Sequence, residues 1–293
     1  MNQDLTGIDL LQSKIMNTEK VWYVTGASQG LGLTIVKSLL RTGYRVAATT
    51  RNEEKLSDAV GIYDTDRFLP IGMQGYDAHR IDESIQQTLT HFGRIDVIVN
   101  NAGYGMAGTV EEITEEKVRD IFEVNTLATI SVVKSVLPIM RRQRSGYIIN
   151  IGSVAGFTGA PGWAIYSATK AAVAAFSEVL AMDVKEFGIK VTVVEPSGFR
   201  TGFLTRHSLA YTEKKIEGYQ TVKETQDRYL AGDGKQPGDP EKAAALFIQL
   251  AESPAPPLHL FLGRDAFNRA SEKLASMKAE LEAWKSETIS ADF

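Results

Sequence analysis

The feature that most constrains this chain is a regular alternation of short apolar runs with longer amphipathic segments. Seven runs have the length and composition of buried strands, and helix-length segments separate most of them. Continuous apolar strands joined by helical crossovers favour a parallel sheet covered on both faces. Right-handed crossovers then give a doubly wound α/β fold. The predicted strands are residues 21–25, 45–50, 67–73, 95–100, 146–151, 190–195 and 258–262.

The helical segments complete this pattern and define the organisation of the chain. We expect one domain over residues 20–263, a mobile leader at 1–19 and a helical tail at 264–293. A polar segment at about 199–236 breaks the alternation and is predicted to be a helical substrate lid. The predicted helices are residues 31–41, 115–142 (with a bend near Pro138), 166–187 and 241–251. We expect the apolar stripe of the tail, Leu274, Met277, Leu281 and Trp284, to pack on its own domain.

Composition narrows the possible functions. The chain has 293 residues, 43% hydrophobic and 23% charged, which is typical of a globular protein. A net charge of −4 argues against wholesale binding of nucleic acid or of an anionic membrane, and no apolar run reaches the length of a membrane span. Without cysteines, and with scattered histidines, we expect no disulfide and no metal site. No secretion signal is recognised, so we expect a cytoplasmic protein.

A glycine-rich turn joins the first strand to the first helix. Residues 25–32 read Thr-Gly-Ala-Ser-Gln-Gly-Leu-Gly. Glycines at such a place let the backbone turn sharply and approach a pyrophosphate, which lies on the positive end of the helix. Two alternatives are a plain tight turn and the G-x-S-x-G pattern of a hydrolase, with Ser28 as nucleophile and His207 or His259 as base. The hydrolase pattern leaves Gly32 unexplained.

The end of the second strand bears on the choice of nucleotide. An acidic residue there would bind the ribose 2′-hydroxyl of NAD and repel the 2′-phosphate of NADP. This chain has Thr50 at that position and Arg51 directly after it. A guanidinium can bind a phosphate through two hydrogen bonds, so we expect NADP(H) to be preferred over NAD(H). The alternative is that Arg51 is an ordinary solvated charge.

Tyr166 and Lys170 lie four residues apart in a predicted helix, and Ser153 precedes the tyrosine by thirteen residues. Positions i and i+4 share one helix face. An ammonium favours the phenolate, so we expect Lys170 to lower the pKa of Tyr166 from about 10 towards neutral pH. The pattern predicts a proton donor for carbonyl–alcohol chemistry, with Ser153 holding the carbonyl oxygen. Taken singly, each of these residues could also be structural.

These motifs, in this order and spacing, resemble those of the short-chain dehydrogenase/reductase family over about residues 19–263. Residues 25–32 resemble its dinucleotide turn, residues 100–103 (Asn-Asn-Ala-Gly) its motif after the fourth strand, and residues 196–201 its segment beside the nicotinamide. The resemblance implies a single-domain Rossmann fold with Ser153, Tyr166, Lys170 and Asn125 as catalytic residues. It implies cofactor contacts by Gly26, Ser28, Gln29, Gly30, Leu31, Gly32, Thr50, Arg51, Gln74, Asn101, Ala102, Gly103, Tyr166, Lys170, Pro196 and Thr201.

The resemblance also implies a mechanism. Hydride would pass from the nicotinamide to a carbonyl carbon, while Tyr166 protonates the oxygen and Ser153 hydrogen-bonds it. Lys170 would also bind the nicotinamide ribose, and Asn125 would hold a water that returns protons to Lys170. Two positions depart from the family pattern. Gln74 stands where an aspartate usually accepts the adenine amino group, and Ser197 replaces a glycine.

Aromatic side chains beside these motifs indicate the kind of substrate. We expect an apolar pocket for a bulky ketone, aromatic or steroid-like, although the same side chains could serve packing alone. The family often forms homodimers or homotetramers through the helices that hold Asn125 and Tyr166, and we expect the same here. Other readings are a non-catalytic NADP-binding regulator and a nucleotide-sugar epimerase or dehydratase. The candidate pocket residues are Tyr104, Met106, Phe157, Trp163, Phe199 and Phe203.

Overall fold

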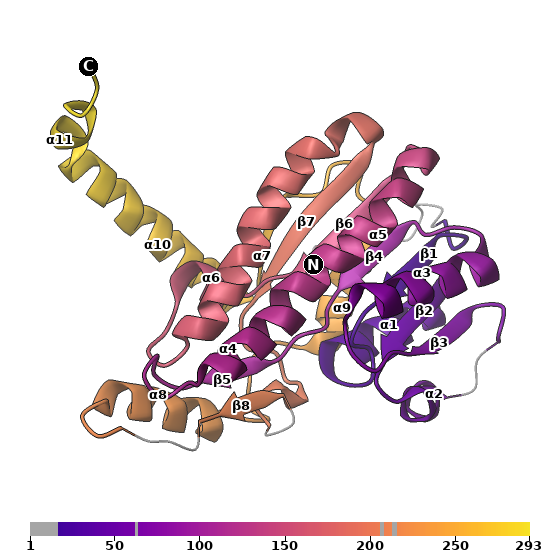
Figure 1. The fold of residues 1–293 in the computed structure, drawn as a ribbon, viewed down its shortest axis with the longest axis horizontal. Coiled ribbons are helices and arrows are strands. Elements are labelled where there is room, and N and C mark those ends of the chain that lie inside the picture. Colours follow the sequence, from indigo (N-terminus) through magenta and orange to yellow (C-terminus); the bar gives the residue numbers. More distant parts are fainter. Residues whose placement is uncertain (1–16, 62–63, 206–207, 213–215) are drawn as a thin grey trace, which may run out of the picture.

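The protein is built around a seven-stranded parallel sheet (Figure 1). The computed structural model describes residues 17–61, 64–205, 208–212 and 216–293. The strand order is β3-β2-β1-β4-β6-β7-β9, so the winding reverses between β1 and β4, which opens a crevice at the carboxyl ends of the strands. The strands are β1 (Val21–Val24), β2 (Arg45–Thr50), β3 (Phe68–Gly72), β4 (Val97–Asn100), β6 (Gly146–Ile151), β7 (Ile189–Pro196) and β9 (His259–Leu262).

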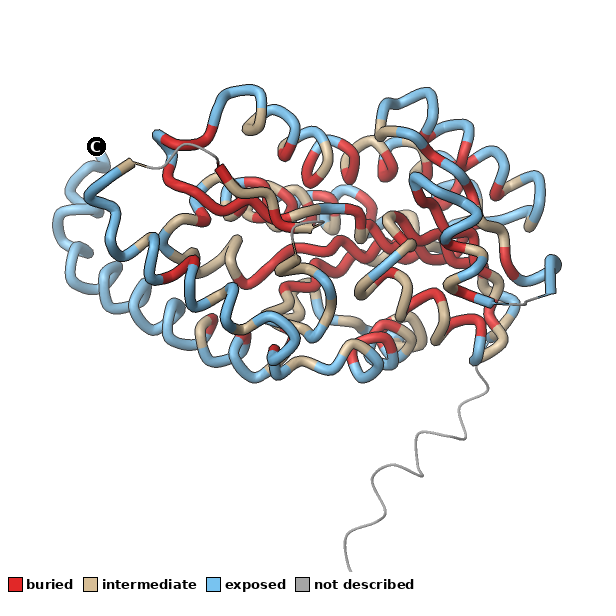
Figure 2. Tube along the Cα trace, turned by 90° about the horizontal axis from the view of Figure 1, so that it is seen from below, coloured by how far each residue is buried: buried red, intermediate tan, exposed pale blue. Residues whose placement is uncertain are grey.

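Helices cover both faces of the sheet. Successive strand residues point to opposite faces, so Trp22 and Val24 belong to one hydrophobic core and Tyr23 to the other. Figure 2 shows buried residues concentrated along the sheet between the two helical layers. The first core includes α1 (Gly30–Thr42), α2 (Glu53–Val60) and α9 (Pro240–Glu252), and the second includes α3 (Ala78–Phe92), α5 (Ala128–Gln143) and α7 (Ala164–Asp183).

The doubly wound α/β fold predicted from the sequence is confirmed. The predicted strands at 45–50 and 146–151 coincide with β2 and β6. The predicted bend near Pro138 was wrong, since Pro138 lies inside α5. The irregularity lies earlier, where a π-helical turn (Glu123–Leu127) joins α4 (Glu115–Phe122) to α5. Asn125 sits in that turn and binds the chain after β4, which accounts for the widened helix.

The predicted lid segment contains a helix, as expected, and also a short strand that the sequence did not indicate. A short strand β8 (Leu209–Tyr211) pairs in parallel with β5 (Gly105–Ala107), and a helix α8 (Gln220–Ala231) follows. Three-residue strands are too short for a hydrophobic period to reveal. Residues Met106, Trp163, Tyr166 and Leu209 share a third hydrophobic core, so the lid packs directly against the helix that carries the tyrosine.

The two ends of the chain differ from each other. Residues 1–16 of the predicted leader lie outside the described residues, and Lys20 directly before β1 pairs with Glu252 at 2.7 Å. At the other end, α10 (Arg264–Ala283) leaves the domain after its second turn and is followed by α11 (Lys285–Ile289) (Figures 1 and 2). The prediction that the tail stripe packs on its own domain was wrong. Leu274, Met277, Leu281 and Trp284 are 56, 42, 68 and 64% exposed, because only the first turns of α10 touch the domain.

Among the described residues, one helical stretch is long and apolar enough to span a membrane, contrary to the sequence expectation. It runs over Glu115–Gln143, and 44% of its most apolar window is buried within the protein. Val132, Val136 and Met140 of α5 are buried in the second core. Packing against the sheet therefore explains the apolar character of this stretch.

Candidate active site

The glycine-rich turn after β1 forms one wall of a large cavity. Gly26 and Gly30 have φ angles of 66° and 58°, which residues with side chains rarely adopt. A Cβ atom on Gly26 would lie 2.8 Å from the Cα atom of Ala102. Gln29 precedes α1 without capping it, and the first turn of α1 holds no acidic residue. The turn therefore offers backbone N–H groups and a positive helix end, which fits the pyrophosphate of a dinucleotide.

The Asn-Asn-Ala-Gly loop after β4 is tied to this turn. The Nδ2 atom of Asn101 donates to the backbone oxygens of Thr25 and Gly26, at 2.9 and 3.0 Å. The Oγ1 atom of Thr25 accepts from the N–H groups of Asn101 and Ala102, both at 3.0 Å. A Cβ atom on Gly32 would meet the Asn101 side chain and lie 2.6 Å from the Gly26 oxygen. Gly32 thus allows α1 to pack on the loop and does not line the cavity.

Thr50 and Arg51 lie at the end of β2 and line the cavity. Thr50 is buried, and its hydroxyl hydrogen-bonds the backbone of Asn52. Arg51 is exposed and forms no ion pair with any residue that the structure describes. Its guanidinium therefore remains available to an anion at this end of the cavity.

Gln74 does not reach the cavity, so its position does not support the predicted adenine contact. Its Nε2 atom donates to the backbone oxygen of Arg51, and this bond holds the chain after β2 to the chain after β3. Tyr76, two residues further on, lines the cavity instead and was not singled out in the sequence. Burial raises the pKa of Tyr76, and the nearby charge of Arg51 lowers it.

Most of the residues that the family resemblance assigned to the cofactor do line this cavity. Ser197, which departs from the family pattern, lines it too, and its hydroxyl donates to the Leu262 oxygen at 3.5 Å. The predicted residues on its walls are Gly26, Ser28, Gln29, Gly30, Leu31, Thr50, Arg51, Asn101, Ala102, Gly103, Tyr166, Lys170, Pro196 and Thr201.

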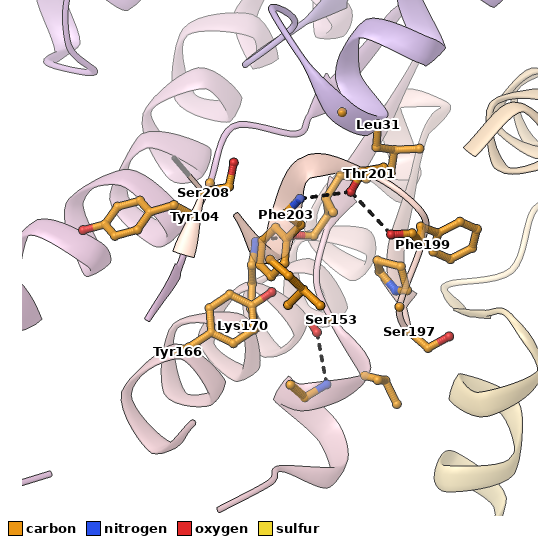
Figure 3. A pocket seen from close by; sticks show the side chains of 18 of the residues that line it. Leu31, Tyr104, Ser153, Tyr166, Lys170, Ser197, Phe199, Thr201, Phe203 and Ser208 are labelled. Carbon is orange, nitrogen blue, oxygen red and sulfur yellow. Dashed lines mark hydrogen bonds between the residues drawn. The ribbon is translucent and has the colours of Figure 1, made fainter. Parts of the chain in front are cut away.

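Ser153, Tyr166 and Lys170 converge on the middle of the cavity, which has a volume of about 1210 Å³ (Figure 3). Tyr166 and Lys170 lie one turn apart on α7, and both are at least nine-tenths buried. Ser153 precedes α6 (Val154–Thr158), and its Oγ atom accepts from the Ala155 N–H group at 3.1 Å. The fold thus brings the serine, from the end of β6, to the helix of the other two residues.

Burial sets the protonation of the tyrosine and the lysine in the protein alone. It raises the pKa of Tyr166 to about 12, and a hydrogen bond from Ser153 partly offsets this effect. It lowers the pKa of Lys170 to about 8. The ammonium of Lys170 donates to the Ile151 oxygen at 2.8 Å. The expected lowering of the tyrosine pKa is not found here, because desolvation has the largest effect on Tyr166 and outweighs the hydrogen bond from Ser153. At neutral pH Tyr166 therefore keeps its proton.

Asn125 holds the loop after β4 next to Lys170. Its side chain is fully buried, accepts from the Tyr104 N–H group at 3.0 Å, and donates to the Tyr104 oxygen at 3.0 Å and to Thr169 Oγ1 at 3.2 Å. A Cβ atom on Gly103 would lie 3.0 Å from Asn125 Oδ1 and 3.4 Å from Lys170 Nζ. The hydrogen bonds of the side-chain amide thus position the loop after β4 beside the lysine.

The aromatic side chains divide into two groups. Tyr104, Trp163, Phe199 and Phe203 line the cavity as predicted, and the Tyr166 ring lies 5.4 Å from Trp163 and 6.0 Å from Phe203 between ring centroids. The two other candidates do not line it. Met106 is buried in the third core, and Phe157 packs on Phe261 with ring centroids 5.2 Å apart. The prediction of Phe157 as a pocket residue was wrong, because the short helix α6 points it towards β9.

The structure gives no support to the hydrolase alternative. Ser28 lines the cavity, but His259 does not, since its two ring nitrogens lie 3.0 Å from Glu195 and 3.3 Å from Glu178. His207 lies outside the described residues. Within the described ranges, no group of three or more His, Asp or Glu side chains could hold a metal ion.

The glycine-rich turn and the buried Tyr166 share one cavity, an arrangement that fits a nicotinamide-dependent oxidoreductase. Comparison with known proteins narrows the class. The family model described as short chain dehydrogenase matches residues 20–211. The chain is 36% identical to the oxidoreductase BOA17 of Botryotinia fuckeliana, over 91% of this chain and 97% of that protein. It is 32% identical to the 3-ketodihydrosphingosine reductase of Bacteroides thetaiotaomicron, over 82% of this chain and 86% of that protein.

Among solved structures, the chain is similar to the crystal structure of a short-chain dehydrogenase from Streptomyces avermitilis. The TM-score is 0.85 and the sequence identity is 39%, with coverage of 93% of this chain and 100% of that chain. The chain therefore belongs to the short-chain dehydrogenase/reductase family, whose members use NAD or NADP.

Proposed function

We propose that this protein reduces a ketone or aldehyde to an alcohol, reversibly, with NADP(H) as the preferred cofactor and Tyr166 as general acid and base. The observation that carries the proposal is the position of Tyr166. Its buried side chain faces the same cavity as Ser153 and Lys170, and the glycine-rich turn bounds that cavity (Figure 3). A proton donor and a dinucleotide site within one cavity serve carbonyl reduction.

The roles of the three residues follow from their chemistry. When bound, the nicotinamide supplies a hydride to the carbonyl carbon. Ser153 donates a hydrogen bond to the carbonyl oxygen and turns it towards Tyr166. Tyr166 gives its proton to that oxygen, so one hydride and one proton convert C=O to CH–OH. Lys170 stabilises the phenolate that remains, and with a pKa of about 8 it carries its charge at neutral pH.

Asn125 acts as a positioning residue in this proposal. Its amide group holds the backbone of Tyr104 and the hydroxyl of Thr169, so both side-chain N–H bonds are used within the protein. The amide fixes the loop of Gly103, whose backbone approaches the lysine closely. We therefore assign Asn125 to the geometry of the lysine and leave proton return to the hydroxyls and solvent of the cavity.

The NADP preference rests on the end of β2. Thr50 and Arg51 line the cavity, and Arg51 has no acidic partner among the described residues. A guanidinium and a hydroxyl would bind the 2′-phosphate that distinguishes NADP from NAD. Cells keep NADP largely reduced, so we propose reduction as the main direction.

The substrate and the setting of the enzyme are also proposals. Trp163, Phe203 and Tyr104 suit a bulky apolar ketone, aromatic or steroid-like. The relative named 3-ketodihydrosphingosine reductase is, by its name, a reductase of a ketone, which supports this reaction type. We propose that the protein acts in the cytoplasm as a homodimer or homotetramer on small molecules, without a nucleic-acid or membrane partner.

A non-catalytic NADP-binding regulator on the same fold is the alternative. Steady-state rates with NADPH, NADH, NADP+ and NAD+ against a panel of aryl ketones and the matching alcohols test both. We expect ketone-dependent oxidation of NADPH, with kcat/KM at least ~10-fold above that for NADH. NADPH binding without oxidation by any ketone would favour the regulator, and faster turnover with NADH would refute the cofactor preference.

A further inference from the structure

The cavity extends past Tyr166 to a wall that proton transfer does not use. Next to the tyrosine this wall is aromatic, with the Trp163 ring centroid 5.4 Å from that of Tyr166 and 5.0 Å from that of Tyr229 on α8. The cavity is also lined by charged side chains from α8, from the segment after α8 and from the start of α10. The aromatic side chains suit the apolar body of a ketone. The charged side chains do not, so they need a separate explanation.

One pair of these charges is satisfied within the protein. The Nη1 atom of Arg269 lies 3.5 Å from the carboxylate of Asp265. Its Nη2 atom donates to Thr158 Oγ1 at 2.5 Å and to the Gly159 oxygen at 3.0 Å. Arg269 and Asp265 therefore form a fixed, neutral part of the wall, which joins α10 to the chain after α6.

Arg228 and Lys235 are different. Both line the cavity, one on α8 and the other four residues beyond the end of that helix. Neither side chain forms an ion pair or a hydrogen bond anywhere in residues 17–61, 64–205, 208–212 or 216–293. Both residues are exposed where they line the cavity. Two positive charges without an acidic partner, on a largely apolar cavity, attract and orient an anion.

Two buried polar atoms on the same wall also have no partner. Among the described residues, the Trp163 Nε1–H group has no acceptor and the Gln236 Oε1 atom has no donor, although these residues are only 4 and 6% exposed. A buried group left unpaired costs roughly 1–3 kcal/mol, and a buried indole N–H usually has an acceptor. Both residues line the cavity. A ligand oxygen there can accept from the Trp163 N–H group, whereas Gln236 Oε1 needs a donor such as a hydroxyl or a water.

We infer that the substrate is an apolar ketone that also carries an anionic oxygen group, a carboxylate or a phosphate, bound by Arg228 and Lys235. Trp163 donates its N–H to an oxygen of the same substrate, near the carbonyl held by Tyr166. The same charges repel a substrate with an ammonium group. This inference rests on the proposed function, because it takes the carbonyl to lie at Tyr166.

A matched pair of substrates tests the inference by activity. The rates with para-benzoylbenzoate and with its methyl ester are compared with NADPH as cofactor, together with the corresponding phosphonate to separate the two anions. We expect kcat/KM at least ~10-fold higher for the better anion than for the ester, with an advantage that shrinks as salt is added. The double variant Arg228→Gln/Lys235→Gln should bring the ratio of acid to ester close to one.

A binding measurement separates this inference from the proposed function. Biphenyl carboxylate has no ketone, and its Kd with the NADPH complex is measured by calorimetry. We expect it to weaken at least ~10-fold in Arg228→Gln/Lys235→Gln, and about 5–10-fold in Trp163→Phe, which keeps an aromatic ring but loses the N–H donor. Lys223→Gln is the control, because Lys223 is an exposed cation of α8 outside the cavity and should leave both binding and turnover as in the wild type.

The outcomes are distinct. If the carboxylate binds through Arg228 and Lys235 but no ketone is reduced, the proposed function fails and the anion site stands. Equal wild-type rates for acid, phosphonate and ester would overturn the anion site while leaving carbonyl reduction intact. A loss of NADPH affinity in Arg228→Gln/Lys235→Gln would also overturn it, since the two cations would then serve the cofactor.

Discussion

The two walls of the cavity differ in how completely their polar groups are paired. On the wall built by the glycine-rich turn and the loop after β4, Asn101, Thr25 and Asn125 spend their hydrogen bonds on nearby backbone. On the wall built by the lid helix α8 and by the start of α7, Arg228 and the indole N–H of Trp163 have no partner within the described chain. The difference teaches that one wall is fixed by the protein itself, whereas the other leaves groups free for a variable ligand.

The same substitution, glycine to alanine, placed behind each wall should test this comparison most strongly. In Gly32→Ala the new methyl would meet the Asn101 side chain and lie 2.6 Å from the Gly26 oxygen. We expect a loss of about 1–3 kcal/mol in the free energy of unfolding, and NADPH binding weakened by roughly 100-fold, because displacement of a positioned group is costly. Chemical denaturation and fluorescence titration measure these effects.

Gly202→Ala in the lid is the matched control. The nearest atoms to a Cβ there belong to Thr205, at 3.8 and 3.9 Å, which is ordinary contact. We expect a change within about 0.5 kcal/mol and unaltered NADPH affinity. Equal losses at Gly32 and Gly202 would show that the two walls are not differently constrained.

Lys170→Met should change stability and activity in opposite directions, because burial of the ammonium destabilises the folded protein. The unfolded chain keeps the lysine proton up to its ordinary pKa of 10.5, whereas burial lowers the folded pKa to about 8. The unfolded state therefore binds more protons between these values, so wild-type stability rises with pH across that window. We expect the methionine variant to be inactive yet more stable than the wild type at pH 7, by roughly 1–3 kcal/mol.

Calorimetric Tm values across the alkaline range check the sign of this effect. The advantage of Lys170→Met should be fully present below pH 8 and should shrink between pH 8 and about 10.5, where the wild type gains stability. An advantage that grows with pH, or a variant less stable at every pH, would show that the ammonium is not destabilised by burial.

Arg51→Asp should give a more limited effect, confined to one end of the cavity. A carboxylate there repels a 2′-phosphate and accepts from a 2′-hydroxyl, so the kcat/KM ratio of NADPH to NADH should fall by roughly 10–100-fold. Steady-state kinetics at fixed ketone concentration measure the ratio. An unchanged ratio would mean that Arg51 is only a solvated charge.

Removal of residues 271–293 should have the smallest effect. In α10 only Ala266 and Ala270 are buried, and every residue from 271 onward is exposed. We expect the free energy of unfolding to change by less than about 0.5 kcal/mol, because no buried contact is lost. Thermal unfolding of the truncated protein measures it, and a large drop in Tm would show that the tail is covered in solution.

The positions of Tyr166, Lys170 and the glycine-rich turn could be predicted because they depend on short stretches of sequence. Tyr166 and Lys170 are four residues apart, which places them on one helix face. The glycines of the turn indicate a backbone conformation that other residues rarely adopt. Local spacing also misled in two places. It suggested that Phe157 faces the substrate, whereas α6 turns this side chain towards Phe261. It also predicted an apolar stripe on the tail, but the stripe is exposed and not packed on the domain.

The lid wall could not be predicted, since its residues meet only in three dimensions. Tyr229 reaches Trp163 across more than sixty residues of chain, and Arg228 looks like any surface charge of an amphipathic helix. Tyr76 likewise enters the cavity through the placement of the chain after β3. No period or motif marks such positions, so only the structure distinguishes them from solvated residues.

The most direct test of the account is the Tyr166→Phe variant, which removes one oxygen and keeps the ring between Trp163 and Phe203. Its kcat with NADPH and an aryl ketone is measured together with the Kd for NADPH. The account predicts that kcat falls at least ~100-fold, the usual scale of a lost general acid, while the Kd stays within about twofold. A variant that still reduces the ketone at the wild-type rate would contradict the assignment of the proton to Tyr166.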